Sequence, residues 1–245
     1  MTNTTPGSVA AAAPKSLLAR FVGIITSPRE TFQSVVAHPR WLGMLLLTTV
    51  IAAVGTAAPM MTEAGRQAAL DRQVKQMESF GFQVNEEMYA RMQQGMGRAP
   101  YTTAISILLI SPIIAVIIAG IFFLVFNAAL GGDATFRQLF SVIVHAGVIS
   151  AAAQFFIAPL NLIRGSMESA TNLGVLLPML EEGSFLARLL GMVDLFVLWW
   201  VLVLAIGLGV LYRRRTQPIA FSLLGVYAVI AICVAAIMSR LGGTH

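Results

Sequence analysis

Long apolar segments alternate with short polar ones along this chain, and that pattern sets the expected fold class. A helix of about 20 residues is long enough to cross the roughly 30 Å of hydrocarbon in a bilayer. In lipid the backbone groups must bond within the segment, which requires helix. The pattern therefore predicts an all-α polytopic membrane protein, with a five-helix transmembrane bundle over 41–240. The predicted spans are at about 41–61, 101–127, 138–163, 189–212 and 218–239.

The region before the first span divides into a tail and two short helices. Residues 1–15 are small or polar, and we expect a disordered tail. Residues 16–40 show apolar positions at helical spacing, and Ser27-Pro28-Arg29-Glu30 has the order of a helix start with a capping box. Neither helix is long enough to span. We expect amphipathic helices at the membrane interface, apolar side down; packing on the protein's own loops is the alternative.

The polar stretch 62–100 separates the first two spans. Acidic and basic residues are balanced in it, apolar residues recur at helical spacing, and Gly81 interrupts the pattern. These features predict an extramembrane insert of two short amphipathic helices. A charge-balanced helical hairpin is more typical of a solvated cap on the bundle than of a site.

Composition agrees with a membrane protein. Hydrophobic residues make up 57% of the chain and charged residues 11%, against about 25% charged in soluble domains. The net charge of +5 comes from basic residues that flank the apolar runs. No basic-aromatic stripe accompanies them, so we expect contact with the lipid bilayer and none with nucleic acid. The single cysteine, Cys233, allows no intramolecular disulfide.

The charge distribution also predicts an orientation. Basic residues divide equally between the two sides of a five-span bundle, but Arg213, Arg214 and Arg215 stand together in one short turn. Such a cytoplasmic basic turn is where the positive-inside bias is strongest. We therefore expect a multi-pass protein of the cell inner membrane with a cytoplasmic N-terminus and an external C-terminus.

Polar residues inside the predicted spans are the candidate functional positions, because they are costly in lipid. A proton relay is conceivable for His145, but no second ligand stands at metal-site spacing, and hydrogen bonding across helices explains His145 and Gln154 better. A transport role is the alternative for Asp194. The candidates are Asn127, His145, Gln154, Asn161 and Asp194.

No catalytic motif is present. The sequence contains no GxSxG, Walker loop, HExxH, Rossmann fingerprint or CxxC. We therefore expect no enzyme activity, no catalytic residues, no cofactor and no metal.

Three segments resemble the Yip1 family of integral membrane proteins, in its bacterial branch. They are IITSPRETF at 24–32, HPRW at 38–41 and GGDATFRQL at 131–139. Where the family commonly has Tyr and, four residues later, Pro, this chain has His145 and Ile149. The resemblance implies five spans and a cytoplasmic N-terminus. Eukaryotic relatives act in vesicle traffic with small GTPases, and bacteria lack that traffic, so a membrane scaffold is the role that carries over.

The leading hypothesis is thus a non-enzymatic scaffold or accessory protein that acts by helix packing and membrane-surface contacts. Its expected partner is another membrane protein, for which an exporter complex is one candidate, or a second copy of the chain. The rival is a small permease or channel that uses His145, Asp194 and proline-kinked spans. An intramembrane enzyme is a third, weaker reading.

Overall fold

The computed structural model describes residues 16–241 except 168, 178 and 181–183, and the described part is all-helical. The disordered tail expected over 1–15 lies outside the described residues. The elements are α1 (Leu17–Thr26), α2 (Pro28–Ala37), α3 (Leu42–Ala57), η1 (Pro59–Met61), α4 (Glu63–Ser79), α5 (Glu86–Gly95), α6 (Ala99–Phe123), η2 (Leu124–Ala129), α7 (Phe136–Ala146), α8 (Val148–Arg164), η3 (Leu173–Leu176), α9 (Phe185–Met192), α10 (Leu195–Leu211) and α11 (Thr216–Leu241).

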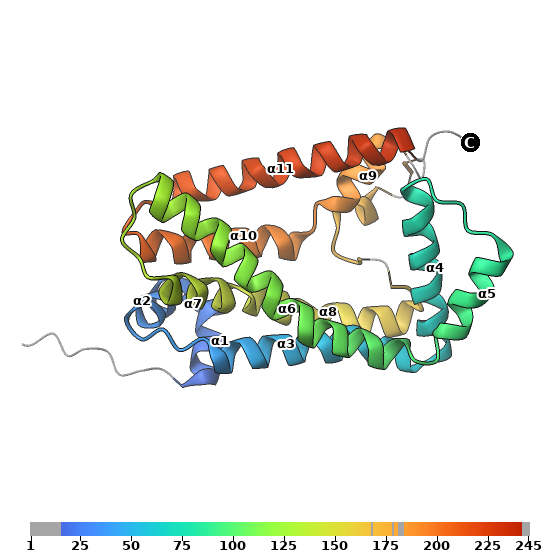
Figure 1. Cartoon of the computed structure of the whole chain (residues 1–245), viewed down its shortest axis with the longest axis horizontal. Helices are drawn as coiled ribbons and strands as arrows, with labels where there is room; N and C mark the ends of the chain where they lie inside the picture. Colours follow the sequence, from blue (N-terminus) through green and yellow to red (C-terminus); the bar gives the residue numbers. More distant parts are fainter. Residues whose placement is uncertain (1–15, 168, 178, 181–183, 242–245) are drawn as a thin grey trace, which may run out of the picture.

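Helices α3, α6, α8, α10 and α11 run along the molecule, whereas α1, α2, α4, α5 and α9 lie towards its two ends (Figure 1). We call the end with α1, α2, residues 130–135 and residues 212–215 the basic end. The opposite end carries α4, α5 and α9 (Figure 1). The polypeptide passes along the bundle in α3, α6, α7–α8, α10 and α11 in turn.

Four of these passes are long and apolar enough to be membrane spans: Leu42–Met61, Ala99–Ala129, Phe136–Arg164 and Thr216–Arg240. The segment predicted as one span over about 189–212 is not a single helix. Helix α9 ends at Met192, and α10 covers only Leu195–Leu211, 17 residues. The break arises because Asp194 caps α10 with its side chain, which accepts from the amides of Phe196 and Val197.

The pass Phe136–Arg164 is the centre of the bundle, because 67% of the residues in its most apolar 18-residue stretch are buried. It contains two α-helices that meet at Gly147, a division that the continuous apolar pattern does not reveal. A capping box at Thr135 and Gln138 starts α7. In contrast, only 6% of the residues in the most apolar 18-residue stretch of α6–η2 are buried, and 11% of those in the matching stretch of α11. These two passes therefore leave much of their apolar surface outside the core.

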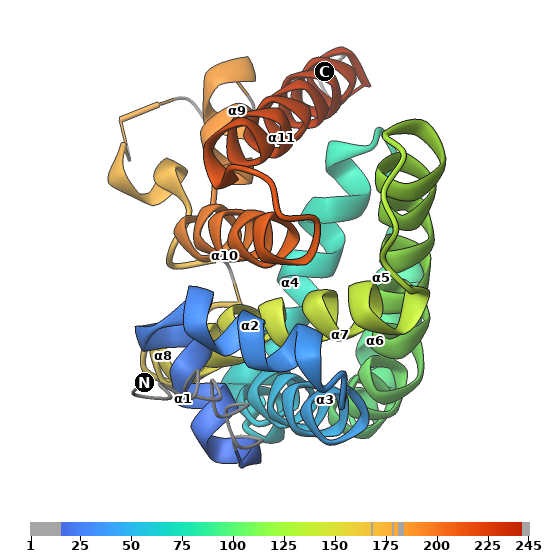
Figure 2. The ribbon, with the colours of Figure 1, turned by 90° about the vertical axis from the view of Figure 1, so that its left-hand side faces the viewer.

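Helices α1 and α2 differ in how completely they pack on the rest of the protein. Helix α2 lies across the basic end against α7 and α10, with Phe32 and Val35 fully buried (Figure 2). Helix α1 buries Ile24 but leaves Leu18 and Val22 exposed. Thus α2 packs on the protein itself, whereas α1 leaves part of its apolar side exposed, and its predicted place at the membrane interface stays a prediction.

The predicted helix start at Ser27 is only partly right. Helix α2 does begin at Pro28, but the Ser27 side chain makes no capping hydrogen bond. Ser27 instead closes α1, because its backbone N–H donates to the carbonyl of Gly23. One residue thus ends one helix and starts the next, which leaves its hydroxyl outside the usual capping geometry.

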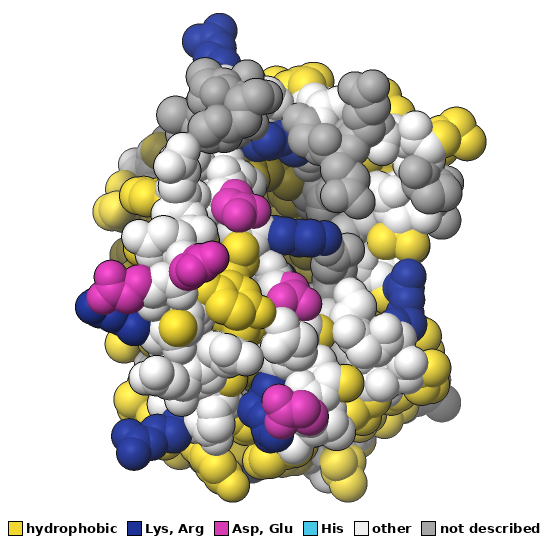
Figure 3. Space-filling view, turned by 90° about the vertical axis from the view of Figure 1, so that its right-hand side faces the viewer, with side chains coloured by type: hydrophobic (Ala, Val, Ile, Leu, Met, Phe, Trp, Pro, Cys, Tyr) yellow, Lys and Arg dark blue, Asp and Glu magenta, His cyan; other side chains and the backbone are white. Residues whose placement is uncertain are grey.

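The polar stretch after the first span forms α4, of 17 residues, and α5, of 10 residues, at the end opposite α1. Lys and Arg side chains are interspersed with Asp and Glu on that face (Figure 3). Gly81, between the two helices, has a φ of 83°, a conformation that only glycine adopts without strain.

Gly207 sets the distance between α10 and its neighbours. A Cβ at this position would lie 2.6 Å from Cγ1 of Val142 on α7 and 3.0 Å from the Phe32 ring on α2. Three helices therefore meet at one residue without a side chain. Close approach of this kind is how helices associate in lipid, where no hydrophobic push exists between them.

We expect Gly207→Ala to destabilise the bundle by about 1–3 kcal/mol, because overpacking a close contact forces the neighbours apart. Gly225→Ala on α11 is the matched control, since a Cβ there meets nothing within 4 Å. Thermal unfolding in a mild detergent measures the difference. Equal melting temperatures for the two variants would contradict the packing role of Gly207.

Candidate functional site: buried polar residues and a basic pocket

The structure does not bring the five candidate polar residues into one cluster. Each makes contacts with a different set of partners, so each is described with its own surroundings. The basic turn of Arg213, Arg214 and Arg215 is part of a separate pocket.

His145 is fully buried on α7, and both ring nitrogens have partners. Its Nδ1 lies 2.7 Å from the carbonyl oxygen of Ser141, and its Nε2 lies 3.2 Å from Nη1 of Arg20 on α1. A carbonyl only accepts and a guanidinium only donates, so Nδ1 carries the proton and Nε2 accepts. The imidazole is therefore neutral and fully occupied, an arrangement that serves to hold α1 against α7.

Arg20 links three parts of the basic end. Its Nη1 donates to His145 and also to the carbonyl of Arg40, at 2.8 Å, in the segment that leads into α3. Burial lowers the pKa of Arg20, and the charge of Arg40 acts in the same direction. The buried Nε of Arg20 has no recorded hydrogen-bond partner among the described residues. A short amphipathic helix thus places a guanidinium against the bundle core.

Asp194 is a helix cap with four hydrogen bonds. Its Oδ2 accepts from the hydroxyls of Ser169 and Thr171, at 2.7 and 2.6 Å. Its Oδ1 accepts from the backbone amides of Phe196 and Val197, at 2.8 and 3.4 Å. These bonds tie residues 169–171 to the start of α10. The carboxylate is occupied by structural partners, which favours a structural role over transport.

Asn127 joins the end of the α6–η2 pass to α10 and to the loop before α7. Its Nδ2 donates to the carbonyl of Ala134 at 2.6 Å, and its Oδ1 accepts from the Tyr212 hydroxyl at 2.7 Å. The Tyr212 ring stacks on Phe126, with centroids 4.8 Å apart. A Cβ at Gly132 would lie 2.6 Å from the Tyr212 ring, so glycine is required at this contact.

The remaining two candidates lie at helix contacts on α8. The Gln154 side chain packs so closely on Gly55 of α3 that a Cβ there would lie 2.7 Å from it. Asn161 is buried, and its Nδ2 has a weak contact of 4.0 Å with the Met167 sulfur. Neither geometry assembles a reactive centre. No group of three or more His, Cys, Asp or Glu residues suited to a metal occurs in the part of the chain that the structure describes.

The basic turn ends α10 in an uncommon conformation. The N–H of Arg214 donates to the carbonyl of Gly209, and that of Arg213 to the carbonyl of Val210. This is the Schellman pattern, in which the left-handed position is usually glycine. Here it is Arg213, with a φ of 52°, the one non-glycine residue with positive φ among those described. A left-handed conformation costs an ordinary residue about 1 kcal/mol.

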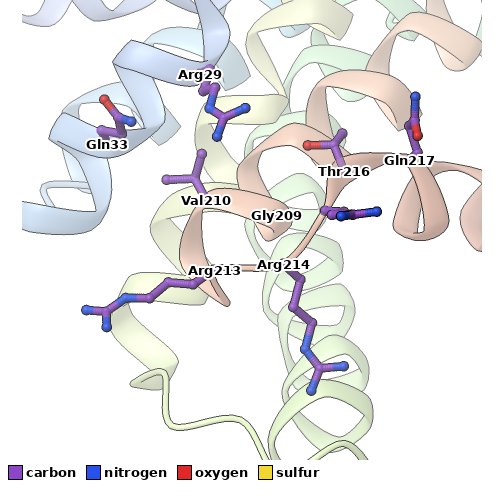
Figure 4. A pocket seen from close by; sticks show the side chains of 9 residues that line it. Arg29, Gln33, Gly209, Val210, Arg213, Arg214, Thr216 and Gln217 are labelled. Atoms are coloured by element: carbon purple, nitrogen blue, oxygen red, sulfur yellow. The ribbon is translucent and has the colours of Figure 1, made fainter.

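A pocket of about 750 Å³ opens beside this turn (Figure 4). Arg29 reaches it from α2, across Val210, while the side chains of Arg213 and Arg214 diverge from the turn (Figure 4). None of the described lining residues is acidic. The lining residues are Arg29, Gln33, Gly209, Val210, Arg213, Arg214, Arg215, Thr216 and Gln217.

The Yip1 domain matches residues 22–238, which is nearly the whole of the described helical bundle. The chain belongs to the Yip1 family. No curated protein and no solved structure shows significant similarity to it. The family generally comprises non-catalytic membrane proteins, so this chain is a multi-pass membrane protein of a generally non-enzymatic family.

Sequence reasoning found His145 and the basic turn of this Yip1-domain protein but not their partners. In the sequence, Arg20 is one polar position within the amphipathic stretch 16–40, and it lies 125 residues from His145. Arg29 was interpreted as part of a helix start. No periodicity or motif connects such distant positions, so only the packing of α1 and α2 on the bundle reveals them.

We expect the Arg20–His145 contact to stabilise this Yip1-domain protein. Arg20→Met removes the donor and leaves Nε2 of the buried imidazole unsatisfied, which costs about 1–3 kcal/mol. In a double-mutant cycle with His145→Leu, the two losses should be strongly non-additive. Unfolding in detergent measures each variant. Arg91→Met on exposed α5 is the control, expected within about 0.5 kcal/mol of the parent; additive losses at Arg20 and His145 would refute the contact.

Proposed function

We propose that this chain is a non-enzymatic scaffold or assembly protein of a bacterial inner membrane. The observation that carries the proposal is the contrast between the inside and the outside of the bundle. Inside, His145, Asn127 and Asp194 are held by hydrogen bonds to groups that fix helices in place. Outside, the passes of α6–η2 and α11 leave nearly all of their apolar residues unburied. This arrangement supports the recruitment of helices or lipid rather than chemistry.

The proposed surface for a partner is the outward stripe of α6. Its residues stand four apart, on one face of the helix, and each is more than half exposed. The expected partner is a second membrane protein, for instance a component of an exporter complex, or another copy of the chain. The stripe consists of Ile105, Leu109, Ile113, Ile117 and Ile121.

In the proposed topology α10 is a fifth span and the N-terminus is cytoplasmic. Its 17 residues fall at the lower limit of the range for spanning helices, about 17–25. The positive-inside bias supports the orientation, because Arg213, Arg214 and Arg215 stand together in one short turn of the basic end, whereas the basic residues of the opposite end are spread over longer segments.

A permease is the second candidate, and one cavity favours it. An open pocket of about 210 Å³ lies between α3, α6 and α8, beside the junction of α7 and α8 at Gly147. Three hydroxyl side chains line it, those of Thr48, Ser111 and Ser150. A solute path would need to continue from this cavity to both ends.

Photo-crosslinking tests the scaffold. A photoreactive residue at Leu109 or Ile117 should give a discrete protein adduct in the native membrane, because these positions lie on the proposed partner surface. Ile118 is the matched control, since it packs against the hydrophobic core and should crosslink only within the chain. Recovery of a lone monomer without protein adducts, both in the membrane and in mild detergent, would argue strongly against a scaffold.

Cysteine labelling tests the topology and the permease together, in a Cys233→Ser background. A membrane-impermeant maleimide should label Gln93→Cys in intact spheroplasts, and Asp133→Cys only after permeabilisation. The scaffold predicts no labelling of Thr48→Cys, Ser111→Cys or Ser150→Cys. Labelling of all three would favour the permease, and labelling of Asp133→Cys in intact spheroplasts would reverse the proposed orientation.

A further inference from the structure

An apolar groove adjoins the basic pocket. It has a volume of about 480 Å³ and lies between the end of the α6–η2 pass and the first turns of α11. Among the described lining residues, Ser222 has the one uncharged polar side chain and Arg214 the one charged side chain. The apolar lining consists of Ile121, Phe122, Val125, Phe126, Leu130, Pro218, Ile219, Leu223 and Val226.

Arg214 connects the two spaces, because it lines both the groove and the basic pocket. One of its guanidinium nitrogens donates to the carbonyl of Leu130, 2.9 Å away, at the edge of the groove. A guanidinium has five N–H donors in a planar fork, so donors remain for an anion after this contact. The pocket and the groove thus place a cationic cleft beside an apolar groove, with Arg214 common to both.

We propose that this pair of cavities binds an anionic phospholipid. Its phosphate lies among Arg29, Arg213, Arg214 and Arg215, and one acyl chain lies in the groove along α11. The proposal does not depend on the scaffold role or on the identity of any protein partner.

Charge and chemistry support the phosphate position. Four arginines line the pocket, and no described lining residue is acidic. Arg is the residue best suited to phosphate, because its fork forms two parallel hydrogen bonds to the oxygens. The turn also keeps Arg213 in a left-handed conformation, where glycine would fold without strain. Helix termination does not need an arginine at this position, whereas an anion site does.

Dimensions favour a lipid over a free phosphate. The groove follows α11 from Pro218 to Val226, a rise of about 12 Å. One leaflet of the hydrocarbon core is about 15 Å thick, half of the whole. The arginines lie at the end of the bundle, at the level where headgroups are expected if α11 spans (Figure 1). A free phosphate would use the pocket but would leave the apolar groove without a function.

The test measures lipid retention on the full-length protein by native mass spectrometry in a mild detergent, with phosphatidylglycerol and phosphatidylcholine supplied equally. We expect selective retention of phosphatidylglycerol. Arg213→Gly should lower its affinity by about fivefold, the effect of one interfacial charge, while leaving the melting temperature equal or higher, because glycine is favoured at that position. Arg91→Gly, on the opposite end, should leave lipid retention unchanged.

A groove variant separates the lipid from a free phosphate. Ser222→Phe fills the apolar groove and should reduce phosphatidylglycerol retention without a change in charge. Val229→Phe, on α11 outside the groove lining, should leave phosphatidylglycerol retention unchanged. Glycerol phosphate and inorganic phosphate should compete weakly. Equal retention of both lipids, or displacement of phosphatidylglycerol by inorganic phosphate with no effect of Ser222→Phe, would overturn the lipid site. Loss of protein crosslinks at Leu109 would leave this outcome unaffected.

Discussion

Hydrocarbon offers no hydrogen-bond partner, and the position of the polar side chains in this bundle follows from that constraint. His145 bonds to a carbonyl of its own helix and to Arg20, and Asn127 bonds to a carbonyl and to the Tyr212 phenol. The bonds to Arg20 and to Tyr212 join segments far apart in the sequence. The same need for satisfied polar groups therefore also fixes the short helices that cannot span, since α1 is held by the guanidinium it contributes.

Close contacts at glycines hold the helices together in lipid, where the hydrophobic effect does not drive helices into contact. Gly207 receives Phe32 and Val142, Gly55 receives Gln154, and Gly132 receives Tyr212. In lipid, association depends on van der Waals packing and on interhelical hydrogen bonds. The central pass of α7 and α8 contributes Val142 and Gln154 to these contacts and is largely buried, whereas α6 packs on α3 and α7, and α11 on α10 and α9, with few residues of either helix fully buried. The bundle thus has a well-packed interior and outer helices with free apolar faces.

The sequence predicts the spans well because length and hydropathy are local properties. It locates α3, α6, the α7–α8 pass and α11 within a few residues, and it locates the two helices of the polar insert. It misses the interruption before α10, since a single Asp194 within an apolar run does not reveal that its carboxylate is a cap. It also misses Arg20 and Arg29 as partners of the bundle. Those contacts depend on how α1 and α2 fold back on the basic end, which no spacing encodes.

The conformation of the basic turn is more closely defined than the orientation of the protein in the membrane requires. The positive-inside bias depends on how many basic residues lie on a side, not on the conformation of any one of them. Arg213 nevertheless occupies a left-handed position, at a cost of about 1 kcal/mol that glycine would avoid. Arg29 meets the same pocket from α2, and Arg214 extends it to an apolar groove. A requirement for charge alone would be met by flexible loop arginines. The fixed arrangement, with its cost in strain, supports recognition of a particular anionic group at the membrane surface.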